Sequence, residues 1–187
     1  MSGEIIEYRK ATDADLPLIL DLQQANLAQN LSAEEASREG FVSIQHSLEL
    51  LTAMNQGHGH TIAFHQNTLV GYALVMSPSF SKAIPLLEPL FEKINAGCYQ
   101  NNPLAKTPYV IMGQVCIAKA FRGQGIFTGL YKNLDERLAG HFKYLITEIH
   151  RTNARSIRAH KKYGFQTLGN TEPSQAEEWV TVIKELD

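Results

Sequence analysis

A strand, a glycine-rich turn and a helix follow one another in this chain, and this stretch constrains the fold most. An apolar run from Tyr109 to Ile117 predicts a buried strand, and Gly123 and Gly125 come shortly after it. Apolar residues then recur at three- and four-residue steps, which predicts one face of a helix: Phe127, Leu130 or Tyr131, Leu134 and Leu138. A turn without Cβ atoms before a helix N-terminus offers free amides and a partial positive charge, so the stretch predicts a phosphate or pyrophosphate site.

The glycine turn alone is open to three other interpretations. A P-loop needs a lysine after its last glycine, and Gly125 and Gly129 are too close together for that motif. A dinucleotide-binding turn needs a third glycine where Thr128 stands and should follow the first strand, although Glu148 lies where a ribose-binding acid would be expected. In a bare structural turn, the glycines would serve only to reverse the chain.

Length and composition limit the class of protein. The 187 residues suit one domain spanning 1–187, and the 44% apolar and 19% charged residues are ordinary for a soluble globular chain. The net charge of -2 disfavours a general binder of nucleic acid or anionic membranes. The chain contains no membrane-spanning apolar run, no secretory signal and only Cys98 and Cys116, so the cytoplasm is the expected location. Cys116 lies in an apolar strand and is expected in the core.

The order of predicted elements indicates an α/β fold with a mixed sheet, antiparallel at first and parallel in the middle. Strands are expected at 5–8, 61–64, 69–76, 109–117, 144–150, 165–168 and 178–186. A first helix is expected to begin near Asp15, with Leu18, Leu22 and Ala25 at helical spacing, and a second at 43–55, with Ile44, Leu48 and Leu51 facing inward. Further helices are expected at 82–95, after Gly125 and at 153–163. Residues 30–40 are expected to form a loop or irregular helix, and 95–108 a long loop. A right-handed crossover should join the strands at 109–117 and 144–150.

Two segments resemble motifs of the GCN5-related N-acetyltransferase (GNAT) superfamily. The segment from Arg122 to Phe127 resembles Arg/Gln-x-x-Gly-x-Gly/Ala, except that Phe127 stands where the family has a small residue. The segment from Asn153 to Phe165 is similar to Asn-x-x-Ala/Ser-x-x-x-Tyr-x-x-x-Gly-Phe, with His160 at the tyrosine position. A helix and a strand separate the two segments, as in the family. Their order and spacing carry the resemblance further than either motif alone.

The resemblance implies a single-domain, mostly antiparallel sheet with a central parallel pair splayed at a bulge, and helices on both faces. It implies acetyl-CoA as co-substrate and no metal, with the pantetheine arm in the gap between the splayed strands. Main-chain contacts to that arm are expected from Val115, Cys116 and Ile117. Amides around the pyrophosphate are expected from Gly123, Gln124, Gly125, Ile126, Phe127 and Thr128. Arg122 would either assist the phosphates or only fix the loop.

The resemblance also suggests catalytic roles. Asn153 and His160 share a helix face with Ile157, and Asn153 would hydrogen-bond the cofactor. A protonated His160 would replace the family's tyrosine as the acid for the thiolate, or it would simply pack against the cofactor. Glu148 lies in an otherwise mostly apolar strand, where a carboxylate needs a partner or a role, and partial burial would raise its pKa toward that of a general base. Alternatively Glu148 would bind amides or orient the substrate.

The expected function is an N-acetyltransferase that moves an acetyl group to a primary amine of a small molecule or peptide by direct attack. The alternative is a non-catalytic acyl-CoA-binding module on the same fold. Residues 15–55, the segment 79–108 and the last strands should hold the acceptor, with Gln114 as a polar wall. The identity of the acceptor, the length of the acyl group and the oligomeric state all stay open, and the resemblance allows a homodimer because dimers are common in the family.

Two weaker patterns have simpler explanations. The histidines His58, His60 and His65 do not follow zinc-ligand spacing, so a solvated loop before a strand is expected there. The basic helix that begins near Arg155 is expected to be a solvated face, unless one of its cations meets the 3′-phosphate of CoA.

Overall fold

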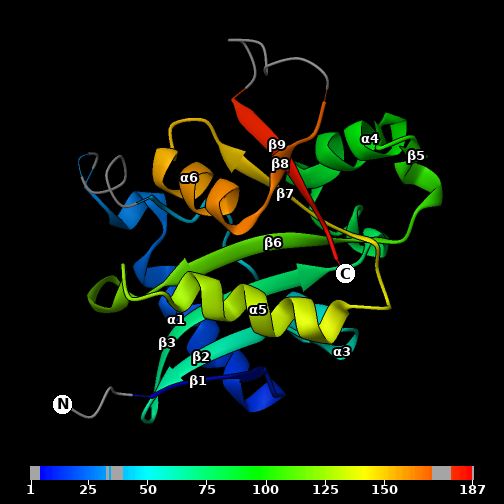
Figure 1. Cartoon of the computed structure of the whole chain (residues 1–187). Helices are drawn as coiled ribbons and strands as arrows, with labels where there is room; N and C mark the ends of the chain where they lie inside the picture. Colours follow the sequence, from blue (N-terminus) through cyan, green and yellow to red (C-terminus); the bar gives the residue numbers. More distant parts are fainter. Residues whose placement is uncertain (1–4, 33, 35–39, 170–177, 187) are drawn as a thin grey trace.

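The computed structural model describes residues 5–32, 34, 40–169 and 178–186, with the backbone alone described at position 86. In this part of the chain, a seven-stranded sheet has the order β1-β2-β3-β6-β7-β9-β8, and helices lie on both of its faces (Figure 1). The sheet is antiparallel throughout except for the β6–β7 pair, which is parallel. The expected α/β fold with a mixed, mostly antiparallel sheet is confirmed.

The elements of the described chain follow the expected order. The strands of the large sheet are β1 (Ile6–Lys10), β2 (Thr61–His65), β3 (Thr68–Met76), β6 (Tyr109–Ile117), β7 (Tyr144–His150), β8 (Gln166–Thr167) and β9 (Trp179–Glu185). The helices are α1 (Leu16–Ala25), α3 (Leu48–Gln56), α4 (Glu88–Ala96), α5 (Ile126–Leu138) and α6 (Ala154–Tyr163). A separate small hairpin pairs β4 (Cys98–Tyr99) with β5 (Asn102–Pro103). None of the described helices is long and apolar enough to cross a membrane.

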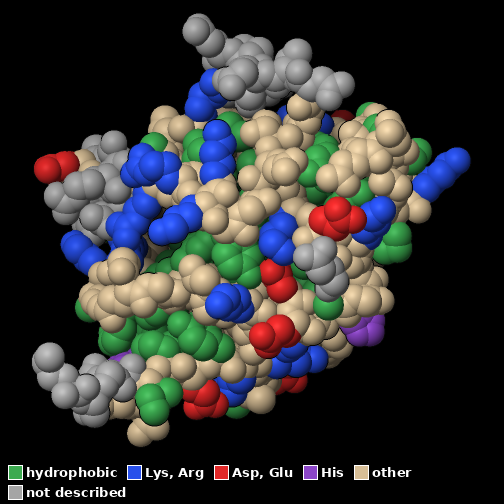
Figure 2. Space-filling view, viewed as in Figure 1, with side chains coloured by type: hydrophobic (Ala, Val, Ile, Leu, Met, Phe, Trp, Pro, Cys, Tyr) green, Lys and Arg blue, Asp and Glu red, His purple; other side chains and the backbone are tan. Residues whose placement is uncertain are grey.

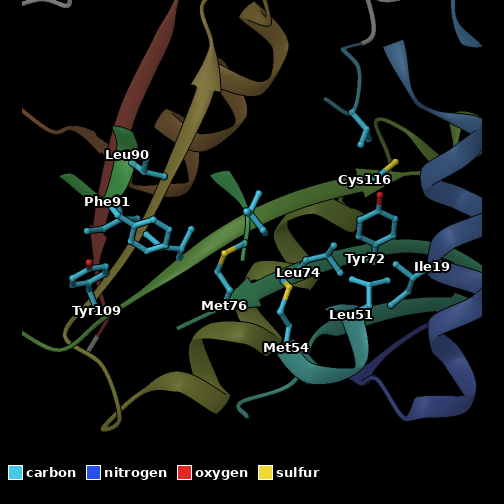
Figure 3. Close-up of a cluster of buried hydrophobic side chains, with 14 of the residues drawn as sticks. Ile19, Leu51, Met54, Tyr72, Leu74, Met76, Leu90, Phe91, Tyr109 and Cys116 are labelled. Carbon is cyan, nitrogen blue, oxygen red and sulfur yellow. The ribbon is translucent and has the colours of Figure 1, made fainter. Parts of the chain in front are cut away.

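The alternation of side chains along the strands builds a core on each face of the sheet. On one face α1, α3 and α4 contribute to a single core. Figure 3 shows Ile19, Leu51 and Met54 near Tyr72 and Leu74 of β3, and Leu90 and Phe91 near Tyr109 of β6. On the other face, α5 and α6 pack against side chains such as Val110 and Met112 of β6. The α5 residues buried there are Ile126, Leu130, Tyr131, Leu134 and Leu138. The predicted helix face is therefore confirmed, with Ile126 added and Phe127 only half-buried.

The two central strands separate part way along their length. β6 pairs with β7 only from Tyr109 to Ile111, while β7 continues to pair with β9 along its full length. On its other side, β6 bulges at Gly113, where the register with β3 shifts. A bulge bends a strand and increases its local twist, so the end of β6 turns away from β7. The expected crossover from β6 through α5 to β7 and the splay at a bulge are both present.

The helix expected at 43–55 begins later than the periodicity suggested. α3 begins after Ser47, whose side chain accepts a hydrogen bond from the amide of Leu50 at 3.1 Å. Leu51 is buried as expected, but Leu48 is 47% exposed. Residues 43–46 lie outside the helix because side chains far away in sequence hold their backbone, as described below.

Three other expectations need adjustment. In α1 the buried residues are Leu16, Ile19 and Gln23, while Leu18 is 41% exposed. The helix expected at 82–95 is the shorter α4 preceded by a 3₁₀ turn (Pro85–Leu87), because each proline is accommodated only near a helix start. The loop at 95–108 contains the β4–β5 hairpin. The irregular segment expected at 30–40 lies largely outside the described residues.

Candidate active site

Two adjoining cavities lie along the gap between β6 and β7. The larger has a volume of about 430 Å³ and the smaller about 380 Å³. The residues shared by both linings are Phe41, Val42, Val115, Asn153 and Ser156. The cavities therefore form one continuous cleft, with the glycine turn at one end and Glu148 at the other.

The glycine turn leaves the first amides of α5 open toward the smaller cavity. Gly123 and Gly125 have φ angles of +80° and +82°, in the left-handed region that a side chain disfavours. A Cβ built on either glycine meets no atom within 4 Å, so the space beside the turn is empty. Gly125 is the N-cap of α5 and has no side chain with which to cap the amides that follow. The turn therefore fits an anion that lies against the backbone.

Most residues of the expected cofactor site line the smaller cavity, two lie outside its lining, and His160 lines the larger cavity instead. Those that line the smaller cavity are Val115, Cys116, Ile117, Arg122, Gly123, Gly125, Ile126, Phe127 and Asn153. The side chains of Gln124 and Thr128 are exposed and are not part of that lining. Gln124 Nε2 instead donates to the Ala120 carbonyl at 3.0 Å and stiffens the turn. Gln124 and Thr128 could therefore serve a ligand only through their amides.

Arg122 holds the turn in place from inside the cleft. Its Nε donates to the Ile117 carbonyl at 3.0 Å, and its Nη2 donates to Asn26 Oδ1 at 2.6 Å. These contacts tie the turn to the end of β6 and to the residue after α1. The loop-fixing role considered for Arg122 is thus present in the structure, and its position in the lining also keeps positive charge beside the smaller cavity.

Phe127 is accommodated because its ring turns into the contact between α5 and α6. Its ring centroid lies 4.7 Å from that of Tyr131 and 5.0 Å from that of His160. Tyr163 and Phe165 complete this aromatic cluster, and the Tyr163 hydroxyl donates to Asp135 Oδ2 at 2.8 Å. The bulky side chain therefore leaves the start of α5 free on its cleft side.

Asn153 and Ser156 lie at the point where the two cavities meet. Asn153 is the N-cap of α6, and its Oδ1 accepts the Ser156 amide at 3.0 Å. A Cβ built on Gly40 would come within 2.8 Å of the Asn153 side chain, so the backbone at Gly40 packs directly on this asparagine. Phe41 and Val42 line both cavities at this junction, and a bridge between Val42 and Leu27 holds them there.

His160 is buried and neutral. Its Nδ1 lies 2.8 Å from the Ser156 carbonyl, which only accepts hydrogen bonds, so Nδ1 carries the proton. Its Nε2 then accepts from the Tyr131 hydroxyl at 2.7 Å. Burial lowers the pKa of His160 to about 4. For such a pKa only about one ring in a thousand is protonated at pH 7, so this environment opposes the protonated-imidazole role expected from the sequence.

Glu148 lies on the half-open face of the β7–β9 pair. It stands opposite Thr181, whose hydroxyl donates to Glu148 Oε1 at 3.0 Å. Two residues further along β7, on the same face, His150 stands opposite Trp179. Glu148, His150 and Trp179 all line the larger cavity. The strand pairing thus places one carboxylate directly beside a wall of two rings.

Gln114 belongs to a buried hydrogen-bond network behind the larger cavity. Its Oε1 accepts from Gln23 Nε2 and from the Tyr72 hydroxyl, both at 2.7 Å, and its Nε2 donates to the Ile44 carbonyl at 2.8 Å. Gln23 also accepts the His46 amide at 2.7 Å. These bonds hold the backbone at Ile44 and His46 in place, and they occupy most of the hydrogen-bonding capacity of Gln114.

Several lining residues could not be assigned from the sequence. Thr147 Oγ1 donates to the Met112 carbonyl at 2.7 Å, where the β6–β7 ladder has just ended. This hydroxyl replaces a lost backbone bond and supports the splay. An isolated glycine in an apolar strand is a signal for a bulge, and Gly113 is such a residue. The segment 41–44, by contrast, carries no motif.

Positive charge gathers at the smaller cavity. Arg155 and Lys162 of α6 line it together with Arg122. Figure 2 shows Lys and Arg side chains grouped over the region where Figure 1 places α6, whose sequence is ARSIRAHKKY. A cluster of cations beside open helix amides suits a ligand with several phosphate charges.

The cysteines and the remaining histidines lie outside this chemistry. Cys116 is buried as expected, and burial raises the pKa of its thiol to about 11. His60 is fully buried rather than part of a solvated loop, with its Nε2 3.3 Å from the Leu51 carbonyl. Within the described residues, no group of three histidines, cysteines or acids is placed to hold a metal ion.

Comparison with known proteins defines the class. The Acetyltransferase (GNAT) family profile matches residues 25–165, and the chain belongs to this family. No match is found among curated proteins. The ribosomal-protein-S18-alanine N-acetyltransferase from Escherichia coli has a similar structure, with a TM-score of 0.61, 12% identity, and coverage of 97% of this chain and 94% of that one.

Two further structures show ligands on similar folds. One is yncA from Salmonella typhimurium with its cofactor acetyl-CoA (TM-score 0.59, 15% identity, 97% of this chain and 94% of that one). The other is the NatC complex bound to Gag peptide and CoA (TM-score 0.64, 13% identity, 97% and 99%). At these identities, the structural likeness establishes the fold.

Proposed function

We propose that the protein is an acetyl-CoA-dependent N-acetyltransferase that acetylates a primary amine by direct attack. The observation that carries the proposal is the continuous cleft between the parting strands β6 and β7, with open helix amides at one end and Glu148 at the other. Family membership and the acetyl-CoA bound to the similar fold of yncA support the same choice of co-substrate.

The residues present fit acetyl-CoA. The amides from Gly123 to Thr128 and the cations Arg122, Arg155 and Lys162 would hold the phosphates. Val115, Cys116 and Ile117 lie where β6 has left β7, so their backbone would meet the pantetheine arm. Asn153, with its Oδ1 committed to the Ser156 amide, would offer its Nδ2 to the same arm. When bound, acetyl-CoA supplies the activated acetyl thioester.

Glu148 is the proposed general base. Thr181 orients its Oε1, and its position in the larger cavity suits a carboxylate that takes a proton from the attacking amine, directly or through water. Backbone amides near Val115–Ile117 would stabilise negative charge on the acetyl oxygen. The nitrogen–carbon bond forms as the carbon–sulfur bond breaks, and the sulfur takes a proton from water. His160 keeps a place in the proposal as a neutral part of the cavity wall.

Release of CoA thiol with a panel of simple amines tests the proposal. The wild-type protein should bind acetyl-CoA and turn over at least one amine, and Glu148→Gln should lower kcat about 10²–10⁴-fold without weakening acetyl-CoA binding. Glu49→Gln is the matched control, because Glu49 is an exposed residue of α3 outside both cavities. An unchanged kcat in Glu148→Gln would remove the assigned base.

A non-catalytic acyl-CoA-binding module is the second candidate. The neutral, fully engaged imidazole of His160 at the family's tyrosine position favours it. Tight acetyl-CoA binding without turnover of any amine would decide for the module. Absence of acetyl-CoA binding would defeat both candidates.

A further inference from the structure

The two cavities differ in charge. Among the described residues, the smaller cavity is lined by Arg122, Arg155 and Lys162 and by no acid. The larger cavity is lined by two acids, Glu148 and Glu178, with Lys93 as its only Lys or Arg. An acceptor in the larger cavity therefore has more acids than Lys or Arg residues around it, which favours a cationic ammonium group.

A wall of rings lies beside Glu148. The ring centroids of His150 and Trp179 are 5.1 Å apart, and that of Phe41 is 5.9 Å from His150. Because His150 is two residues from Glu148 on the same strand face, the Cα atoms of the two residues lie roughly 7 Å apart. That spacing suits a compound with its amine at Glu148 and a flat apolar group against the rings.

The larger cavity also has a wall that is apolar apart from Lys93 of α4. It consists of Leu87, Pro89 and Leu90 at the start of α4, together with Ile111 and Met112 of β6. A second ammonium group that lay against this wall would lose hydration there and would meet the like charge of Lys93. A diamine or a polyamine is thus a poor fit.

The uncharged polar groups of the larger cavity are largely committed to the protein. Gln114 makes three hydrogen bonds within the network behind the wall. Thr147 donates to the Met112 carbonyl, and the Asn153 Oδ1 accepts the Ser156 amide. Gln114, Thr147 and the Asn153 Oδ1 therefore offer little to a substrate rich in hydroxyl groups, such as an amino sugar.

We propose that the acceptor is a small primary amine with a single positive charge and an apolar, arylalkyl-type body. The inference rests on the proposed function, because it takes the larger cavity to be the acceptor site. The cavity volume of about 430 Å³ is in the range of sites for small molecules. The amine binds beside Glu148, and its body packs between the ring wall and the start of α4.

The first test compares kcat/KM for 2-phenylethylamine, cadaverine, phenylalanine and a short peptide that begins with phenylalanine, each with acetyl-CoA and the full chain. 2-Phenylethylamine should exceed cadaverine by about 10-fold or more, since cadaverine places a second ammonium against the apolar wall. It should also exceed phenylalanine, whose carboxylate would lie near Glu148 and Glu178.

A second test reverses the preference. Leu87→Glu places a carboxylate on the apolar wall, at a partly buried position where the α4 region begins. The kcat/KM ratio of 2-phenylethylamine to cadaverine should fall by about 10-fold or more, because the new charge can pair with the second ammonium. Leu18→Glu makes the same change at an exposed position of α1, outside the cavity. This control should leave the kcat/KM ratio of the two amines unchanged.

The outcomes separate the inference from the proposed function. A preference for 2-phenylethylamine that falls in Leu87→Glu but not in Leu18→Glu would support the inference. A preference for cadaverine, for phenylalanine or for the peptide would overturn it while leaving the N-acetyltransferase intact. Acetyl-CoA binding without turnover of any amine would remove the proposed function, and the inference with it.

Discussion

Three buried histidines predict a steep loss of stability in mild acid. His46, His60 and His160 each have a pKa of about 4 in the folded protein, and burial is the largest cause in all three. In the unfolded chain, histidine takes up its proton near pH 6.5. Between these values the unfolded state binds more protons than the folded state, so the free energy of unfolding falls as the pH falls.

The size of the effect follows from the two pKa values. At pH 5 each of these histidines lowers the free energy of unfolding by about 2 kcal/mol relative to neutral pH, so the three together remove about 6 kcal/mol. A domain of this size has about 5–15 kcal/mol in total. The histidine contribution is fully present above pH 6.5 and is lost as the pH falls toward 4.

Urea unfolding followed by far-UV circular dichroism at several pH values from about 7.5 to about 5 measures this slope. His160→Gln keeps hydrogen-bonding atoms but does not titrate in this range, and it should reduce the slope by about a third. His141→Gln, a change at an exposed histidine, controls for loss of an imidazole as such. Equal free energies of unfolding at about pH 7.5 and about pH 5 would refute the assignment of these histidines as buried and neutral.

Three further substitutions test the contacts of the cleft and the start of the fold. Thr147→Val leaves the Met112 carbonyl without its donor and should lower the free energy of unfolding in urea by about 1–3 kcal/mol; an unchanged value would mean that the hydroxyl supports nothing. Gly125→Val forces a β-branched residue into a left-handed conformation and should raise the KM for acetyl-CoA more than it lowers kcat, and an unaffected KM would contradict the role of the turn. Asp15→Asn removes the carboxylate that Arg9 and Thr12 hold, and this pairing keeps the pKa of Asp15 well below its usual range. The substitution should lower the melting temperature more at pH 7 than near pH 2, where part of the wild-type benefit has been lost, and an equal effect at both pH values would contradict the pairing.

The sequence predicted the parts of the fold whose partners are close along the chain. The strand at 109–117, the crossover helix and the strand at 144–150 occur at the expected places because their apolar periods are long and unbroken. The N-terminus of α3 was misplaced because Ile44 and Leu48 happen to lie at helical spacing. What keeps Ile44 out of the helix is a hydrogen bond from Gln114, which is 70 residues away in sequence.

The candidate site divides in the same way. The turn and the Asn153–Phe165 segment carry local motifs, so their positions could be predicted, although not the outward side chains of Gln124 and Thr128. The state of His160 could not be predicted, because it depends on Tyr131 from another helix. The ring wall of His150 and Trp179 depends on strand register across β7 and β9, which no local pattern specifies.

The parting of β6 and β7 leaves two blocks of the sheet joined by a short stretch of strand pairing. Only three residue pairs, from Tyr109–Tyr144 to Ile111–Ile146, join the β1-β2-β3-β6 block to the β7-β9-β8 block along the backbone. Amides of β6 beyond Met112 should therefore exchange hydrogen with solvent faster than those before it, through openings smaller than global unfolding. Acetyl-CoA bound in the gap would contact both β6 and β7 and would thereby join the two blocks. It should slow amide hydrogen exchange throughout both blocks and not only in the residues that it contacts.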